Sequence, residues 1–368
     1  MRDDIYMLWL SSLLPFTGSR KLNSLLEIFG TAREVFMAKV PELERAGGLT
    51  PNAISAVSKR RNLQYIEDLL KEMEAKSMAY FSRAHERFPE LLNAIPDPPV
   101  GIFCMGSLPP DNTHKVAIIG SRRCSEYGLM AARLLAKPLA QAGVVVVSGM
   151  ARGVDSMAHR GALSGGGKTI AVLGCGADIC YPSENRELRE EIINNGCVIS
   201  EYPPGTKPAP HYFPARNRII SGLSNGVVVA EAGKKSGTLI TVDQAMEQGR
   251  EVLAVPGNIS SKLSEGTNQL IREGAHPVSD YTDILYALGI SPTPAKPSGE
   301  AEKSPQKKSL LAPEEKRVYD SLDFEPVSFD MLMEITDLDP GQLHFICTGL
   351  EIKGLIRKLS GSRFVKNP

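Results

Sequence analysis

The stretch HKVAIIGSRRCSEYG, residues 114–128, joins the pattern of a buried strand to a glycine turn and the start of a helix. Val116–Ile119 is a continuous apolar run, Gly120 permits a sharp turn, and a helix is expected to begin near Glu126. Similar runs follow at Val144–Val147, Thr169–Leu173, Val198–Ser200, Val227–Val229 and Val252–Val255, separated by helical stretches. Continuous apolar strands that alternate with helices predict a parallel sheet covered on both faces. We therefore expect an α/β protein with an extended Rossmann-like, doubly wound and mostly parallel sheet in residues 110–289.

The residues before this sheet show a different pattern of apolar positions, prolines and glycines. Residues 1–75 have apolar positions at helical spacing, interrupted by glycines, and predict a small helical domain of the SAM or helix-hairpin-helix type. Its glycine turns at Gly30 and Gly47–Gly48 could present backbone amides to DNA phosphates, or the domain could serve only for packing or interaction. The pattern leaves both interpretations open. Residues 76–109 contain several prolines and predict an extended bridge to the sheet.

The chain after the sheet predicts a linker and a third domain. Residues 290–311 are rich in proline and polar side chains, which favours a flexible linker. Residues 312–368 predict a winged-helix domain, since three short helices are followed by a hairpin. The helices are expected at Pro313–Leu322, Ser328–Ile335 and Pro340–Ile352, the hairpin at Leu355–Val365, and its basic residues are Arg357, Lys358, Arg363 and Lys366. Winged helices bind proteins as well as DNA, so the ligand of this domain stays open.

Composition restricts the kinds of function. The 368 residues carry 42 basic and 42 acidic side chains, so any site for a polyanion must be local. The six cysteines form no C-x-x-C pair, which argues against a metal site and favours a reducing, cytoplasmic environment. The apolar opening, Ile5–Leu14, is too short to span a membrane and lacks the basic flank of an export signal. We expect no membrane association and no metal.

The loops after the predicted strands carry glycines, hydroxyls and cations. Ligands of doubly wound sheets bind at the carboxyl ends of the strands, so these loops are expected to lie together. A glycine turn at a helix start presents backbone amides, and a nearby arginine adds a forked cation, which together suit a phosphate. Each loop alone could be an ordinary tight turn, but five such loops in one sheet favour an anion site.

Three enzymatic interpretations fail on the residues present. No G-x-G-x-x-G motif occurs, which disfavours a dinucleotide cofactor, and we expect no cofactor. The run 162–169 resembles a phosphate-binding P-loop, but it follows a helix and opens a strand, the reverse of the P-loop order. A nucleotide hydrolase of the lysine-decarboxylase-like type needs the pattern P-G-G-x-G-T-x-x-E, and here Thr241 stands in the place of the glutamate. We expect no catalysis.

The ordered motifs of the sheet domain closely resemble the DprA/Smf family, DNA processing protein A. They are G-S-R at 120–122, S-G-M-A-R-G-V-D at 148–155, G-C-G at 174–176, S-E-Y-P-P-G at 200–205, F-P-A-R-N-R-I-I at 213–220 and S-G-T-L-I-T at 236–241. The resemblance implies a non-enzymatic protein that binds single-stranded DNA, protects incoming strands and loads the RecA recombinase in natural transformation. It centres the DNA contacts on Arg122, Phe213, Arg216 and Arg218. Some members carry lysines where this chain has Ser183 and Pro210.

Two hypotheses follow for the same site: single-stranded DNA binding, and nucleotide hydrolysis as the alternative. The predicted DNA contacts are Gly120, Ser121, Arg122, Ser148, Gly149, Arg152, Phe213, Arg216, Asn217, Arg218, Ser236, Gly237 and Thr238. A small pocket binds long DNA tightly only when a second pocket binds the same strand, because the first contact raises the effective concentration for the second. We therefore expect a homodimer with two pockets. The resemblance implies an interface at Leu263–Val278 and offers the helix around Met246 to RecA.

Overall fold

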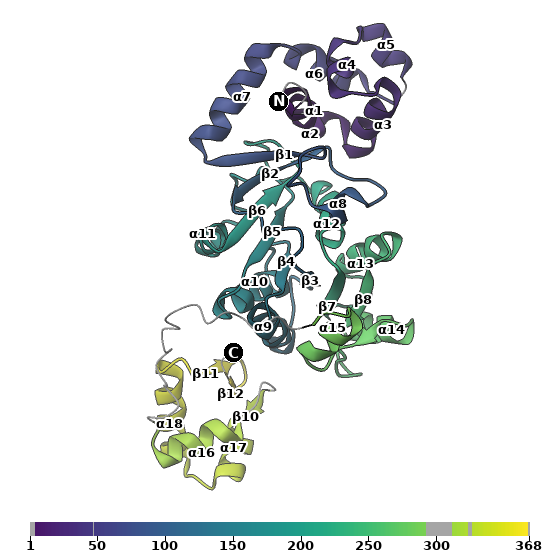
Figure 1. Cartoon of the computed structure of the whole chain (residues 1–368). Coiled ribbons are helices and arrows are strands. Elements are labelled where there is room, and N and C mark those ends of the chain that lie inside the picture. The colour runs from purple at the N-terminus through teal and green to yellow at the C-terminus, as the bar shows by residue number, and fades with distance from the viewer. Residues whose placement is uncertain (1–3, 47, 292–310, 323–325, 367–368) are drawn as a thin grey trace. The chain divides into compact units, whose positions relative to one another are not determined.

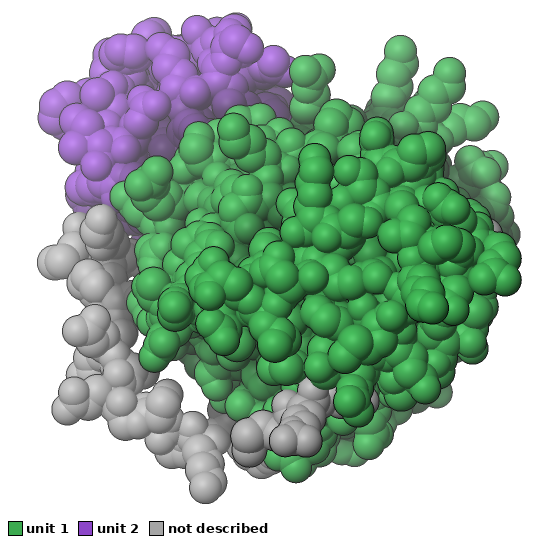
Figure 2. All heavy atoms as spheres, turned by 90° about the horizontal axis from the view of Figure 1, so that it is seen from above, with its two compact units in different colours: residues 1–124, 132–294 green, residues 125–131, 295–368 purple. Residues whose placement is uncertain are grey.

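The computed structural model describes residues 4–46, 48–291, 311–322 and 326–366. Its contacts divide the chain into two compact units, Met1–Cys124 with Ala132–Pro294 and Ser125–Ala131 with Ala295–Pro368 (Figure 2). Among the described residues, no helix is long and apolar enough to cross a membrane. The linker predicted at 290–311 lies almost wholly outside the described residues, as does Gly47.

A nine-stranded sheet forms the centre of the first unit, in the order β1-β2-β6-β5-β4-β3-β7-β8-β9 (Figure 1). The strands from β6 to β9 in this order pair in parallel, whereas β1 and β2 are antiparallel additions at one edge. The strands are β1 (Met78–Ser82), β2 (Gly101–Gly106), β3 (Lys115–Gly120), β4 (Val145–Ser148), β5 (Thr169–Leu173), β6 (Gly196–Ser200), β7 (Gly226–Glu231), β8 (Glu251–Ala254) and β9 (His276–Pro277). The predicted fold class is confirmed.

The predicted bridge, residues 76–109, contributes to the sheet itself. It forms β1, the short helix α8 (Glu90–Asn93) and β2, and Met78 of β1 pairs with Met105 of β2. The sequence did not indicate these two strands, because several prolines break the segment between them.

Side chains of the buried strands alternate between two cores, one on each face of the sheet. In β5, Ala171 and Leu173 pack with α11 (Arg186–Asn194), whereas Ile170 and Val172 belong to the core formed with α12 (Tyr212–Gly222) and α13 (Thr238–Glu247). The other helices of the sheet region include α9 (Glu126–Gln141), α10 (Val154–Ser164), α14 (Glu265–Arg272) and α15 (Tyr281–Ala287), with a 3-10 turn at Ser183–Asn185. Both faces are therefore covered, as parallel strands require.

The helices predicted at the amino terminus are present and share the first of these cores. Trp9 is fully buried, its ring meets Phe36 edge-on at 4.9 Å, and its indole N–H donates to the carbonyl of Arg60 at 3.0 Å. The helices are α1 (Asp4–Ser12), α2 (Leu14–Thr17), α3 (Ser19–Phe29), α4 (Ala32–Met37), α5 (Val40–Arg45), α6 (Pro51–Arg60) and α7 (Leu63–Ala75). Their buried residues form one continuous cluster with residues of the sheet and α11.

The strand order fixes where a ligand site is expected. From β3 the chain proceeds to β4, β5 and β6 on one side, and then crosses back to β7 and β8 on the other side of β3. The direction of winding therefore reverses between β3 and β7. In open α/β sheets, ligands bind in the crevice at the carboxyl ends of the strands at such a reversal.

The second unit contains the predicted three helices and hairpin. They are α16 (Pro313–Ser321), α17 (Phe329–Thr336), α18 (Pro340–Ile352), β11 (Ile356–Leu359) and β12 (Arg363–Lys366), with the added short strand β10 (Val327–Ser328). The strands form a sheet in the order β10-β12-β11, and Leu332, Leu343 and Phe364 belong to a separate hydrophobic core. This arrangement is that of a winged helix.

Candidate functional site

A cavity of about 610 Å³ lies at the carboxyl edge of the sheet, where the winding reverses. It is lined from five loops, those after β3, β4, β5, β6 and β7, and from α12 and α13. Nine of the predicted residues line it: Gly120, Ser121, Arg122, Phe213, Arg216, Asn217, Ser236, Gly237 and Thr238. A smaller adjoining hollow adds Gly149 and Arg152. The structure thus brings together residues that are up to 118 positions apart in the sequence, from 120 to 238.

The turn after β3 is held close to two neighbouring loops. The amide of Ser121 donates to the carbonyl of Glu231 at 2.8 Å, and a side chain at Gly120 would overlap Val154. Gly153 has a φ of 77°, and a side chain there would meet the carbonyl of Ser121. These glycines allow the three loops to meet, which leaves the side chain of Arg122 directed outward and exposed.

Arg122 and Phe213 form a cation–aromatic pair at the cavity wall. The guanidinium carbon of Arg122 lies 5.2 Å from the centre of the Phe213 ring. The other neighbour of Phe213 is Tyr181, whose ring centre is 5.5 Å away and whose side chain is 41% exposed. Phe213 therefore has two flat groups beside it in the cavity wall, and flat accessible groups are the surfaces on which nucleic-acid bases stack.

Arg216 is a buried cation at the base of the cavity. It is 4% exposed, it donates through Nη1 to the carbonyl of Val172, and its Nε has no hydrogen-bond partner. Burial lowers the pKa of Arg216 to about 10, with Asp155 opposing the shift, so the guanidinium is charged at neutral pH. Burial also raises the pKa of Asp155, which lines the same cavity. A charged group with an unpaired N–H in a cavity is suited to an anionic ligand.

Gly149 permits the position of that guanidinium. A methyl group at residue 149 would overlap the end of the Arg216 side chain. Arg152, in the same loop, is exposed and forms an ion pair with Glu184 at the rim of the smaller hollow. The loop after β4 therefore contributes space and a rim charge rather than a hydroxyl.

The turn after β7 leads directly into α13 and is held by hydrogen bonds between Ser236 and Thr238. The hydroxyl of Ser236 donates to the hydroxyl of Thr238 at 2.9 Å, and the amide of Thr238 donates back to the Ser236 hydroxyl at 3.3 Å. Gly237 is the residue before the first turn of α13. The first amides of a helix lack partners within the helix, and they are therefore donors for an anion.

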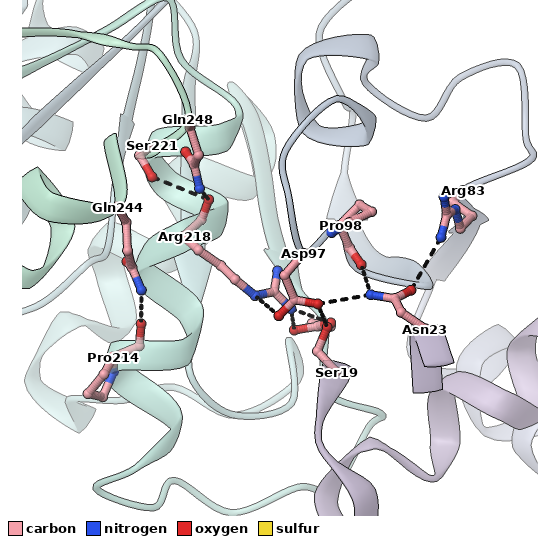
Figure 3. Close-up of polar contacts among 11 residues, drawn as sticks. Ser19, Asn23, Arg83, Asp97, Pro98, Pro214, Arg218, Ser221, Gln244 and Gln248 are labelled. Carbon is pink, nitrogen blue, oxygen red and sulfur yellow. Dashed lines mark hydrogen bonds and ion pairs between the residues drawn. The ribbon is translucent and has the colours of Figure 1, made fainter. Parts of the chain in front are cut away.

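Two predicted contacts lie elsewhere. Ser148 is completely buried, and its hydroxyl donates to the carbonyl of Ile118 at 2.7 Å. Its side chain also forms a hydrogen bond with Asp155, which lines the cavity. Arg218 is 6% exposed and lies outside the cavity, bound to Glu201 and Asp97 (Figure 3). Residues 216 and 218 are two positions apart in a helix, and 100° per residue turns them to nearly opposite faces. Neither side chain lines the cavity or the smaller hollow in this structure, and their contacts with DNA stay predictions.

Sequence reasoning also missed residues that line the cavity. They are Arg123, Ala151, Asp155, Tyr181 and Ile240, among others. Tyr181 precedes Pro182 in the loop after β5, and only the fold shows that its ring lies beside Phe213. Thr241, in the place of the hydrolase glutamate, is buried at the cavity wall. The described residues contain no group of three or more His, Cys, Asp or Glu side chains that could hold a metal ion.

The family model described as DNA recombination-mediator protein A matches residues 79–289, which include the cavity and all of the nine-stranded sheet except Met78. The chain belongs to this family. A second family model, the DprA winged helix domain, matches residues 302–362. The family therefore accounts for both the sheet domain and the winged helix.

Relatives agree with this assignment. The chain is 46% identical over 220 residues to the DNA processing protein DprA of Streptococcus pneumoniae, which covers 60% of this chain and 78% of that protein. It is 31% identical over 387 residues to the protein Smf of a Synechocystis species, which covers 97% of each. The second match extends over nearly the full chain.

Two solved structures resemble the fold. The X-ray structure of the Streptococcus pneumoniae protein superposes with a TM-score of 0.66 and 38% identity, covering 77% of this chain and 97% of that one. DNA processing protein A of Helicobacter pylori, known for a unique single-stranded DNA binding mode, superposes with a TM-score of 0.52 and 33% identity. That match covers 57% of this chain and 95% of the Helicobacter protein.

Proposed function

We propose that this family member binds single-stranded DNA in the cavity at the carboxyl edge of the sheet, without catalysis. The observation that carries the proposal is the pairing of stacking groups with a buried cation. Phe213 lies beside Arg122 at the entrance, and Arg216 has an unpaired Nε at the base. Stacking on an aromatic ring contributes ~1–3 kcal/mol of binding free energy for any base, and the cation can bind the adjoining phosphate.

The proposed contacts are divided by chemistry. Phe213, with Tyr181 beside it, stacks bases. Arg122 and Arg216 bind phosphates, and the turns after β3 and β7 offer backbone amides to the same groups. The full proposed set is Gly120, Ser121, Arg122, Gly149, Arg152, Tyr181, Phe213, Arg216, Asn217, Ser236, Gly237 and Thr238. The single-stranded DNA binding of the Helicobacter pylori relative supports the choice of single-stranded DNA as the ligand.

The cellular role that we propose is protection of incoming strands and loading of RecA onto them in the cytoplasm. This role rests on the family resemblance. The six cysteines form no C-x-x-C pair in the sequence, which is consistent with a reducing compartment. We also propose that the protein acts as a homodimer through Leu263–Val278. In that segment Leu270 and Val278 are buried within the subunit, so Ile259 and Tyr286, 95% and 91% exposed, are the nearby apolar side chains left for a partner.

Two assays on the same preparation test the proposal. Labelled single-stranded oligonucleotides are titrated by fluorescence anisotropy, and nucleoside monophosphates are incubated with the protein and analysed for free base. We expect saturable oligonucleotide binding and no release of base. Release of base without oligonucleotide binding would contradict the proposal and favour the nucleotide hydrolase.

A further inference from the structure

Arg218 of α12, Glu201 and Asp97 form a buried ion-pair cluster (Figure 3), and none of the three lines the cavity. Nη2 of Arg218 donates to both carboxylate oxygens of Glu201, at 2.7 and 2.6 Å, and its Nε lies 3.4 Å from Oδ2 of Asp97. Arg218 and Glu201 are 6% and 4% exposed. Burial raises the pKa of Glu201, while the ion pair with Arg218 opposes that shift. Arg218 thus faces two carboxylates from two different loops.

Helix α3 of the amino-terminal region completes this cluster. The hydroxyl of Ser19 and the amide of Asn23 both donate to Oδ1 of Asp97, each at 2.9 Å. Asn23 also donates to the carbonyl of Pro98 at 2.9 Å, and it accepts from Nη1 of Arg83 at 3.2 Å (Figure 3). Asp97 is therefore shared: one oxygen receives two donors from α3, and the other faces Arg218. A chain of polar contacts joins the amino-terminal helices to α12.

The opposite side of α12 is attached to α13. The side-chain amide of Gln244 donates to the carbonyl of Pro214 at 3.2 Å, and that of Gln248 donates to the carbonyl of Arg218 at 3.0 Å. The same helix carries Phe213 and Arg216 into the cavity. Its placement therefore decides where the stacking ring and the buried cation lie.

We propose that Arg218 is a positioning residue for DNA binding, and that Asp97 transmits the position of α3 to α12. The amino-terminal helices then act on DNA affinity without touching DNA in the cavity. This inference rests on the function proposed above. It differs from a purely structural role, in which the cluster would add to the stability of the fold and leave the affinity of the folded protein unchanged.

Variants that remove the contacts between α3 and Asp97 distinguish the positioning role from the purely structural role. The Ser19→Ala/Asn23→Ala double variant and Asp97→Asn retain both Arg218 and Glu201, and Asp97→Asn also retains the hydrogen bond between Ser19 and Glu201. Arg122→Ala serves as a variant of a direct contact, and Arg189→Lys as a control for changing an equally buried arginine in α11. Each full-length protein is titrated with labelled oligothymidylate at several salt concentrations. The emission of Trp9, the only tryptophan, shows that the amino-terminal helices remain folded.

We expect both variants of the α3 contact to bind about two- to thirtyfold more weakly, the range for coupling through a contact network. Their salt dependence should equal that of the wild type, because no phosphate contact is lost. Arg122→Ala should instead lower the slope, and Arg189→Lys should bind normally. Wild-type affinity in the folded α3 variants would overturn the inference, as would a lower slope. If the wild type fails to bind, the proposed function fails instead.

A measurement on the wild type does not depend on the folding of any variant. Coupling between two sites is reciprocal, so DNA in the cavity must also act on α3. We expect saturating oligothymidylate to slow amide hydrogen exchange in residues 19–29. Unchanged exchange in α3, with exchange at the cavity loops slowed by DNA, would contradict the inference.

Discussion

Replacing Arg122 by alanine should remove one phosphate contact, and so weaken DNA binding, without lowering the stability of the fold. The side chain is exposed, and its neighbour in the cavity wall is the Phe213 ring at 5.2 Å. Removing it therefore leaves no buried group unpaired, and the melting temperature should stay close to that of the wild type. A hydrogen bond to a charged group contributes ~1.5–3 kcal/mol, which corresponds to a loss of affinity of about 10- to 150-fold.

The salt dependence gives a second, independent number. One lost contact to a single-strand phosphate lowers the slope of log affinity against log salt by about 0.7. Fluorescence anisotropy with a labelled oligonucleotide at four or more salt concentrations measures both quantities. Arg160→Ala is the matched control, because Arg160 is equally exposed but lies on α10 beside a different hollow. An unchanged slope and affinity in folded Arg122→Ala would remove Arg122 from the interface.

Three further outcomes are expected. Gly149→Ala should force the guanidinium of Arg216 to move, lowering both the melting temperature and DNA affinity; unaltered affinity would show that Arg216 is not a contact. Burial lowers the pKa of His159 from 6.5 to about 3, so between these pH values the unfolded chain binds a proton at His159 and the folded protein does not. Its contribution to stability is present above pH 6.5 and is lost as the pH falls toward 3, by up to about 1.4 kcal/mol per pH unit. In His159→Gln, the free energy of unfolding measured with urea should depend less on pH in this range. An equally steep pH dependence would show that His159 is not the group responsible. Truncation after Gly289 should leave a soluble protein that binds single-stranded DNA, which gel filtration and anisotropy can check; a complete loss of binding would place the winged helix in the primary site.

The strands β3 to β8 of the parallel sheet could be predicted because each is a continuous apolar run with a turn after it. The last parallel strand, β9, consists of two exposed residues and was not predicted. β5 begins and ends where the sequence indicated, at Thr169 and Leu173. β1 and β2 could not be predicted in the same way. Their pairing joins residues such as Met78 and Met105, and it depends on the fold rather than on a local pattern.

The candidate site shows the same division. The strand-end rule was sufficient to bring Arg122 and Ser236 to one cavity, because parallel strands end at one edge. It could not separate the two arginines of α12. One is directed into the cavity and the other into a buried ion-pair cluster, and the motif that contains both does not reveal which faces the ligand. Tyr181 was missed because a loop side chain acquires its neighbours only in the folded chain.

The preference for single strands over duplex is the measurement that tests the central claim most directly. A labelled oligonucleotide and its duplex are titrated with the full-length protein at several salt concentrations. A cavity that stacks exposed bases on Phe213 can use the single strand, whose bases are accessible, but not the paired duplex. We predict tighter binding of the single strand at every salt concentration, with little dependence on base sequence. Equal affinity for both, or a preference for the duplex, would contradict the account.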